Sequence, residues 1–429
     1  MPKLPAKRFL IALLLVAFFV RFAWVLYSPA LPDQDFTAYH LLAVRLASGQ
    51  GFTGTAGPTA FRPAGYPLLL AAGYFLVGSS FRVGQMLNVM LGTVTVFATY
   101  ALVRRVFSER VGRLAAVLVA LTPSLILYTA VLASENMATP FGLISILLVY
   151  QAFAKNQWRY LPPAGVFIGL AALARPGFLY YPAVVFFYAI FSRSPLTRTV
   201  KFTAVFSLFM LLAIAPWTIR NYLVFGELIP IATNGGFNLA ISFNDEATGE
   251  YMGDITERTL GYAYDWQAYR LIGVDWTEPQ IDAALSNAAR EFIKEQPVQA
   301  ILLIPAKLRF FLLDDVSGVF ENISRPARAT PAWVWSLLRM VAQVYYLAGL
   351  AFAVIGVWMG IFQKKYPSGI LLLLPILYWC ALHGIFLGTD RFHLPILPFI
   401  FAFSSLGAWS LWERYSQIAQ RDKFGKEGA

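Results

Sequence analysis

Residues 9–28 read FLIALLLVAFFVRFAWVLYS, and the polar stretch PDQDFTAYH follows at 32–40. As a helix, the first stretch is long enough to cross the hydrocarbon core of a bilayer, about 30 Å. It is too long, and too soon followed by further apolar runs, for a cleaved signal peptide, so we interpret it as a permanent span. Asp33 and Asp35 then lie at the rim of the membrane. Charge is costly to desolvate there, which indicates a functional role for these carboxylates.

The rest of the chain is similarly apolar. Of its 429 residues, 58% are hydrophobic and 13% are charged, whereas soluble domains carry about 25% charged residues. The mean hydropathy is +0.60. The one cysteine, Cys380, lies in an apolar run, which excludes a disulfide framework and a thiol metal site. We predict an all-α polytopic membrane protein with about ten spans, at residues 9–28, 84–103, 112–130, 137–153, 160–174, 177–192, 202–222, 333–360, 369–387 and 394–412.

The charged residues predict the orientation of these spans. With the N-terminus in the cytoplasm, 18 of the 34 basic residues fall in short cytoplasmic loops and the tail, as the positive-inside rule requires. The net charge of +11 therefore reflects topology and does not indicate a nucleic-acid-binding face. Of the 23 acidic residues, only Glu109, Glu413, Asp422 and Glu427 fall inside. We therefore expect function on the outer face.

This topology predicts three regions. Residues 1–222 form an N-terminal transmembrane module whose first outer loop covers 29–83. Residues 223–331 form a large outer region, with an amphipathic helical pattern over 278–295. Residues 332–429 hold the last spans and a short cytoplasmic tail. Two apolar segments do not fit the count of spans: 66–78 is predicted as a re-entrant or surface helix, and 298–313 as a segment that dips into the membrane.

The first outer loop predicts a helix from Phe36 to Ala47, because apolar residues recur there at helical spacing and Gly49 can end it. Asp35 then stands at the N-cap. It could simply cap the helix, since an Asp there accepts bonds from free backbone N–H groups. It could equally be a general base that takes a proton from an attacking hydroxyl. Asp33 ranks as a supporting or second carboxylate.

Glu135 is the second candidate carboxylate, in the short loop Ser134-Glu135-Asn136 between the third and fourth predicted spans. Ser134 could be an N-cap and Glu135 could be favoured by the helix dipole, with no further role. Alternatively, Glu135 lies in the same cavity as Asp35. His40 could complete a divalent-metal site with these two carboxylates, but the spacing is not diagnostic.

Four arginines lie on the face that is otherwise poor in basic residues: Arg62, Arg175, Arg220 and Arg391. Any one of them could be an interfacial anchor whose charged end reaches water. Together they suit a phosphate, which arginine binds through two parallel hydrogen bonds. Arg391 could instead pair with its neighbour Asp390. The stretch Thr233-Asn234-Gly235-Gly236-Phe237-Asn238 is most simply a turn, and it could also close over a substrate.

With these residues in view, the chain resembles the GT-C glycosyltransferases. It looks closest to the bacterial branch of the dolichyl-phosphate-mannose protein mannosyltransferase family, which includes the aminoarabinose transferase of lipid A. The resemblance covers most of 9–240 and 385–412. It is carried by the order and placement of these short motifs: Asp35 with Tyr39, the Arg62–Pro67 run, Ser134-Glu135, Ala174-Arg175-Pro176, Pro216–Asn221 followed by Thr233–Asn238, and Arg391–Pro395.

The resemblance implies a GT-C fold with surface or re-entrant helices in the first periplasmic loop. It implies Asp35 as the base and Glu135 as the second acid, with Arg62, Arg175, Arg220 and Arg391 on a lipid phosphate. Tyr39, His40, Tyr66 and Asn234 accompany these motifs and complete the expected substrate-binding set. The motif Asp33-Gln34-Asp35 departs from the Asp-Glu pair of the protein mannosyltransferases, and no C-terminal periplasmic domain follows the last span. Both departures put a protein acceptor in doubt.

The expected activity is transfer of one sugar from a polyprenyl phosphate to a hydroxyl of a lipid or cell-envelope glycan, with inversion. The expected partners are this donor, that acceptor and membrane lipids. The expected location is a bacterial inner membrane, with the site facing the periplasm. No cofactor is established, and a divalent metal is left open. The alternatives are a lipid flippase, although no repeats or matched broken spans support it, and a ligase or polymerase of undecaprenyl-linked glycans.

Overall fold

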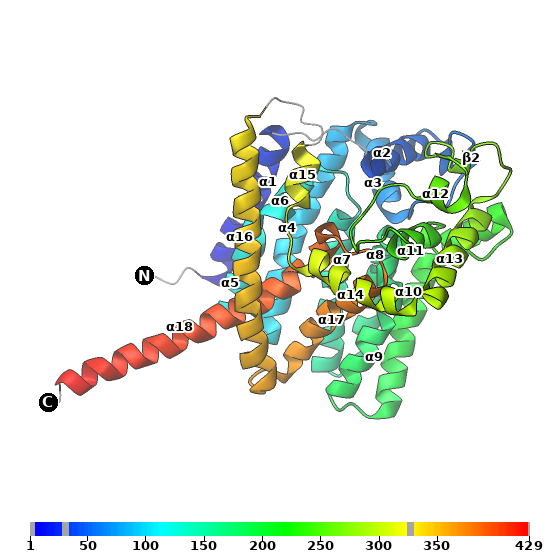
Figure 1. Cartoon of the computed structure of the whole chain (residues 1–429). Helices are drawn as coiled ribbons and strands as arrows, with labels where there is room; N and C mark the ends of the chain where they lie inside the picture. The colour runs from blue at the N-terminus through cyan, green and yellow to red at the C-terminus, as the bar shows by residue number, and fades with distance from the viewer. Residues whose placement is uncertain (1–4, 28–33, 324–329, 428–429) are drawn as a thin grey trace.

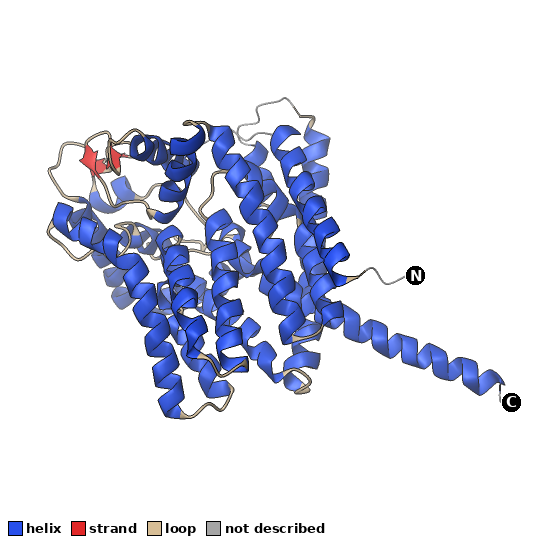
Figure 2. Cartoon of the chain, turned by 180° about the vertical axis from the view of Figure 1, so that it is seen from behind, coloured by secondary structure: helices blue, strands red, loops and turns tan. Residues whose placement is uncertain are grey.

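The computed structural model of the chain describes residues 5–27, 34–323 and 330–427. Apolar helices stand side by side in a bundle, and shorter helices, among them α2, α3, α11, α12 and α13, gather at one end of it (Figure 1). We call this the loop-bearing end. Among the described residues, strands form two antiparallel ladders with two residues in each strand (Figure 2): β1 (Thr53–Gly54) with β2 (Gly57–Pro58), and β3 (Tyr264–Asp265) with β4 (Arg270–Leu271). The predicted all-α class is confirmed.

Seven helices of the described ranges are long and apolar enough to cross a membrane, which confirms a multi-pass membrane protein. A helix pair bent by 56° at Pro123 would make eight if the pair is counted as one span. The proline ring prevents a straight continuation there. The first helix of this pair is α5 (Glu109–Leu121), and the second consists of α6 (Pro123–Leu127) and η1 (Tyr128–Ala130). The seven are α1 (Ala6–Tyr27), α4 (Phe81–Val106), α7 (Glu135–Ala154), α10 (Leu196–Phe225), α16 (Ala332–Val357) with η4 (Trp358–Phe362), η5 (Pro367–Gly369) with α17 (Ile370–Ile385), and η6 (Asp390–Ile396) with the first part of α18 (Leu397–Glu427).

The predicted count of ten spans is not confirmed. The predicted spans 160–174 and 177–192 correspond to α8 (Leu161–Ala174), which follows η2 (Trp158–Tyr160), and to η3 (Pro176–Tyr180) with α9 (Pro182–Phe191). With 14 residues, α8 is about 21 Å long, less than the thickness of the hydrocarbon core. It ends where Pro176 begins the next element, because a proline disfavours helical backbone in the residue before it.

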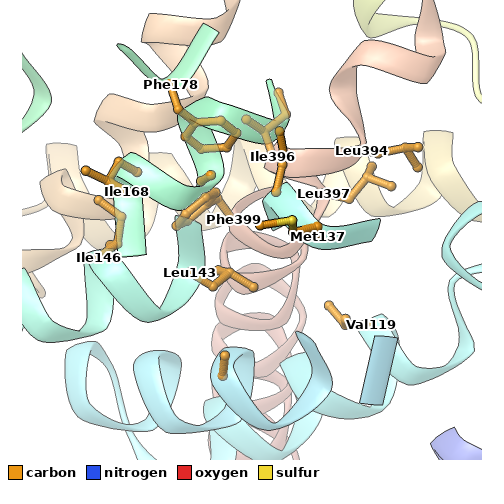
Figure 3. Close-up of a cluster of buried hydrophobic side chains, with 14 of the residues drawn as sticks. Val119, Met137, Leu143, Ile146, Ile168, Phe178, Leu394, Ile396, Leu397 and Phe399 are labelled. Atoms are coloured by element: carbon orange, nitrogen blue, oxygen red, sulfur yellow. The ribbon is translucent and has the colours of Figure 1, made fainter. Parts of the chain in front are cut away.

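The start of α18 is the centre of the bundle. In its apolar stretch 83% of the residues are buried, compared with 22% in α1, which lies at the edge. Figure 3 shows side chains from α5, α7, α8 and the η6–α18 junction meeting in one hydrophobic cluster, with Met137, Leu143 and Phe399 among those labelled. The η6 segment, which carries Arg391, is therefore held by a densely packed core.

Two glycines of α8 let its backbone approach α10 closely. A Cβ at Gly165 would lie 2.4 Å from the carbonyl oxygen of Phe206, and one at Gly169 would lie 2.7 Å from that of Met210. Small residues four apart on a helix are common where membrane helices pack by direct backbone approach. This packing positions the end of α8, and with it Arg175, against the core.

Several short helices at the loop-bearing end agree with the sequence predictions. The helix predicted over 36–47 is α2 (Gln34–Ala47), followed by Gly49 with φ of +78°. The apolar segment 66–78 is α3 (Gly65–Val77), and the amphipathic segment 278–295 is α13 (Glu278–Glu295). The segment 298–313 is α14 (Pro297–Leu312), which has 16 residues and is not among the candidate spans. The remaining helices are α11 (Gly235–Ser242), α12 (Thr256–Leu260) and α15 (Ser317–Ile323).

Candidate active site

Asp35 lies in the first turn of α2, because the helix begins one residue earlier, at Gln34. The prediction that Asp35 is an N-cap is therefore wrong. Each of its carboxylate oxygens faces an arginine: Oδ1 lies 2.7 Å from Nη2 of Arg62, and Oδ2 lies 3.2 Å from Nη1 of Arg391. The side chain is still 31% exposed, so a substrate can reach it. Asp33 lies outside the described residues.

Arg391 joins the two candidate carboxylates. Its Nη1 contacts Asp35, and its Nε donates to Oε1 of Glu135 at 2.6 Å. Its neighbour Asp390 does not pair with the guanidinium. Instead, Asp390 accepts the backbone N–H groups of Val316 at 2.5 Å and Ser317 at 2.7 Å, at the start of α15. Asp390 thus fixes the backbone that presents Arg391.

Glu135 begins α7, and its side chain is only 1% exposed. Ser134 stands at the N-cap position of this helix, as predicted, but its side chain makes no cap hydrogen bond. Arg175, just after the end of α8, donates from Nη1 to the same Oε1 that Arg391 contacts. The guanidinium of Arg175 lies over the ring of Phe392, 4.6 Å from its centroid, in a cation–π contact.

This ion cluster, made of Asp35, Glu135, Arg62, Arg175 and Arg391, contains three positive and two negative groups. The four side chains other than Asp35 are nearly buried. Burial acts to raise the pKa of Asp35, but the positive charges of Arg62 and Arg391 outweigh it and hold the pKa below its usual value. The cluster therefore has one excess positive charge and an ionised, accessible carboxylate.

The other predicted arginine, Arg220, does not join the cluster. It lies on α10 and donates to two backbone carbonyls of the segment between α2 and α3, Phe52 at 3.0 Å and Thr59 at 2.7 Å. Its guanidinium also lies 4.9 Å from the ring of Trp217. In this position Arg220 fastens the segment that leads to Arg62.

Replacing Arg220 with Gln is expected to loosen residues 52–62 locally. Hydrogen bonds to a charged group contribute about 1.5–3 kcal/mol each, and two are lost. Hydrogen exchange of the backbone amides in this segment should accelerate more than tenfold, while exchange in α7 stays unchanged. Lys201→Gln, an exposed change on the same helix, is the control. Equal exchange in both variants would contradict this role for Arg220.

The four remaining predicted site residues make no ion pair with the cluster. Tyr39 is buried with its ring edge-on to Tyr66, 5.6 Å between centroids, and the Tyr66 hydroxyl donates to Asn88 at 2.8 Å. His40 is bonded to the Tyr74 hydroxyl at 2.8 Å, and burial lowers its pKa. Asn234 stands at the N-cap position of α11, without a side-chain cap bond. From Gly235 onward this stretch is helical, so the predicted turn over 233–238 is wrong for residues 235–238.

Glu278 is a positioning residue that the sequence did not reveal. At the start of α13, its Oε2 accepts the N–H of Ala60 at 2.8 Å and the hydroxyl of Thr233 at 3.0 Å. It ties the region 223–331 to the segment just before Arg62. Its only sequence signal is a carboxylate beside a capping Thr277, and that pattern does not say that residue 60 is its partner.

The carboxylates of the cluster do not fit a divalent cation. Oxygens of both Asp35 and Glu135 are engaged by guanidinium groups, and a metal ion would have to share that space with three arginines. His40, the third candidate ligand, is bonded to Tyr74 instead. Across the described ranges, no group of three or more His, Cys, Asp or Glu side chains is arranged to hold a metal.

Comparison with known proteins agrees with the predicted resemblance. Residues 62–219 match the sequence model of the family "Dolichyl-phosphate-mannose-protein mannosyltransferase". This stretch is less than half of the chain, and it includes Arg62, Glu135 and Arg175 of the ion cluster. No curated protein matches the chain.

The fold resembles solved membrane glycosyltransferases. The apo oligosaccharyltransferase of Archaeoglobus fulgidus superimposes with a TM-score of 0.58 and 13% identity, covering 98% of this chain and 52% of that one. The AglB oligosaccharyltransferase of the same organism, in complex with an inhibitory peptide and a dolichol-phosphate, gives 0.57 and 14%, covering 97% and 51%. The present chain thus spans about half the length of these archaeal proteins. ArnT from Cupriavidus metallidurans, bound to undecaprenyl phosphate, gives 0.45 and 12%, covering 93% and 77%.

Proposed function

We propose that this chain, which has the fold of the GT-C membrane glycosyltransferases, transfers a single sugar from a polyprenyl phosphate to a hydroxyl group of a lipid or cell-envelope glycan. One observation carries the proposal: an accessible carboxylate, Asp35, lies among three nearly buried arginines, in a cluster that has one positive charge in excess. A buried excess charge of this kind suits an anion such as a lipid phosphate. The fold likeness to a protein solved with dolichol-phosphate supports the same donor class.

In the proposed reaction, Asp35 takes the proton of the acceptor hydroxyl as its oxygen attacks C1 of the sugar. The new bond joins that oxygen to C1, and the bond between C1 and the phosphate oxygen breaks. The phosphate leaves with the electron pair, and attack from the opposite face inverts the configuration at C1. Arg62, Arg175 and Arg391 stabilise the negative charge that develops on the leaving phosphate.

The arginines couple donor binding to the strength of the base. Before the donor binds, Arg62 and Arg391 stabilise the carboxylate of Asp35, which makes it a weak base. A phosphate that draws these guanidinium groups toward itself shares their charge. The pKa of Asp35 then rises toward that of an ordinary carboxyl group, so Asp35 becomes a stronger base only when the leaving group is in place.

The proposed location is a bacterial inner membrane, with the ion cluster on the periplasmic side. The excess of basic residues in the opposite loops supports this orientation. The cluster lies where α2, the start of α7 and η6 meet, toward the loop-bearing end of the bundle (Figure 1). There it can draw a donor from the outer leaflet.

A polyprenyl phosphate is expected to stabilise the purified protein in detergent, whereas the uncharged polyprenol of equal length is not. A ligand at a hundredfold its dissociation constant stabilises by about 2.7 kcal/mol. We expect the lipid phosphate to raise Tm, and we expect Arg62→Gln to reduce this rise. Arg258→Gln, which breaks an exposed ion pair with Glu246, should leave the rise intact. Equal stabilisation by phosphate and polyprenol would contradict a phosphate site.

Transfer itself is tested with a panel of labelled polyprenyl-phosphate sugars and envelope extract as acceptor. Label incorporated as single sugars supports the proposal. Incorporation of long chains would instead indicate a glycan ligase or polymerase. A folded protein that binds the lipid phosphate and transfers nothing from any donor would favour the transporter.

A further inference from the structure

Arg21 is a buried cation within the first span, six residues before the end of α1. Its side chain has no exposed surface, and its Nη atoms donate to three backbone carbonyls: Ala17 at 3.2 Å, Ala120 at 3.0 Å and Val119 at 3.2 Å. Among the described residues no carboxylate forms an ion pair with it. Charged side chains within membrane spans are costly and are usually functional. Arg21 takes no part in the reaction proposed above.

A small cavity of about 20 Å³ lies between Arg21 and the ion cluster. It is lined by Arg21, Tyr128 and Glu135 among others, so it connects the buried arginine to the buried carboxylate. A cavity of this size holds about one water molecule when it is polar. Gly92 leaves this space open, because a Cβ there would lie 2.7 Å from the Nε of Arg21.

Two polar atoms beside this cavity lack a partner among the described residues. They are the Nε of Arg21 and the hydroxyl of Tyr128, and both side chains are at least 98% buried. Glu135 also has spare acceptor capacity. Its Oε1 is engaged by Arg175 and Arg391, whereas Oε2 has only long contacts, 3.4 Å to Ser134 and 3.5 Å to Arg391. A buried donor without a partner costs about 1–3 kcal/mol, which a bridging molecule would relieve.

We propose that this cavity binds one water molecule, which links Arg21 and Tyr128 to Glu135 and makes Arg21 a positioning residue for that carboxylate. The water accepts hydrogen bonds from the Nε of Arg21 and the Tyr128 hydroxyl and donates to Oε2 of Glu135. Water suits the site better than a small anion, because the carboxylate of Glu135 repels negative charge at the same place. Glu135 is then held by arginines on one side and by water on the other.

The direct test is a density map of the whole protein at a resolution that shows ordered water. One peak within hydrogen-bond distance of all three groups is expected in the wild type, and Tyr128→Phe should weaken or remove it. No peak in a well-ordered wild-type cavity would overturn the proposal. An anomalous peak there after exchange into bromide would overturn it too, since the site would then be an anion site.

A thermal-stability cycle tests the link without any assay of activity. If water connects the two groups, Tyr128→Phe and Glu135→Gln together should lower Tm by less than the sum of the separate losses. Tyr188→Phe, a buried tyrosine that packs on Phe153, should be additive with Glu135→Gln. If the loss of Tm from Tyr128→Phe were also additive with that from Glu135→Gln, the water bridge would be refuted.

The positioning role rests on the proposed function and has its own readout. Tyr128→Phe should lower kcat severalfold while KM for the donor stays within twofold, because the arginines that hold the phosphate are unchanged. A rise in KM with unchanged kcat would contradict positioning of Glu135. If the wild type transfers no sugar, the proposed function fails, whereas the density and the stability cycle still decide the water bridge.

Discussion

Asp35→Asn is expected to lower sugar transfer at least about a hundredfold, the usual contribution of a general base. The amide has no charge and cannot take the proton of the acceptor hydroxyl. The fold should persist, because the remaining amide oxygen can still accept from Arg62, and Arg391 keeps Glu135 as a partner. The measurement is label transfer by equal amounts of folded protein.

Asp254→Asn is the matched control for this change. Asp254 is an exposed carboxylate of the region 223–331 that accepts a hydrogen bond from Trp266 at 3.0 Å. Its replacement should leave transfer within about twofold. If Asp35→Asn behaved like this control, Asp35 would be a structural partner of two arginines and not a base.

The pH dependence follows from the lowered pKa of Asp35. The carboxylate is active when ionised, so the rate should fall only as the pH drops through its pKa. In the free protein this pKa lies below the usual value of about 3.9, because Arg62 and Arg391 outweigh burial. The acid limb of kcat/KM is therefore expected below about pH 4. For kcat it should lie higher, since a bound phosphate shares the arginines.

The sequence predicts the members of the site better than their contacts. Asp35, Arg62, Glu135, Arg175 and Arg391 can each be chosen because a charged residue at the end of an apolar run is unusual. That Arg391 bridges two carboxylates more than 250 positions away could not be predicted. The contact depends on how η6 enters the core, which is a property of tertiary packing.

The misplaced expectations have local causes. Arg220 carries the same sequence signal as the other arginines, but its partners are backbone carbonyls, which have no sequence signature. The predicted helix starts at Phe36 and the observed one at Gln34, because helix ends inferred from apolar periodicity are uncertain by a residue or two. The predicted span at 160–174 stays unconfirmed, because the helix that forms there, α8, has only 14 residues.

Loss of Arg391 is expected to lower both stability and sugar transfer strongly, because Asp35 and Glu135 then lose the arginine that pairs with both of them. Arg391→Met leaves Asp35 with Arg62 only and Glu135, 1% exposed, with Arg175 only. Removing one partner of a buried pair typically costs 3–5 kcal/mol, so we expect a loss of about 3 kcal/mol in stability and more than a hundredfold in transfer. Arg258→Met, which breaks an exposed pair with Glu246, should cost at most about 1 kcal/mol.

Two further variants separate stability from chemistry at this arginine. Arg391→Lys keeps the charge but lacks the planar fork that reaches both carboxylates, so it should recover part of the stability and little of the transfer. Adding Glu135→Gln to Arg391→Met removes the poorly paired buried charge, and stability should rise again while transfer stays lost. If transfer returned along with stability, Arg391 would serve only to hold the fold, and the excess positive charge would have to reach the phosphate through Arg62 and Arg175.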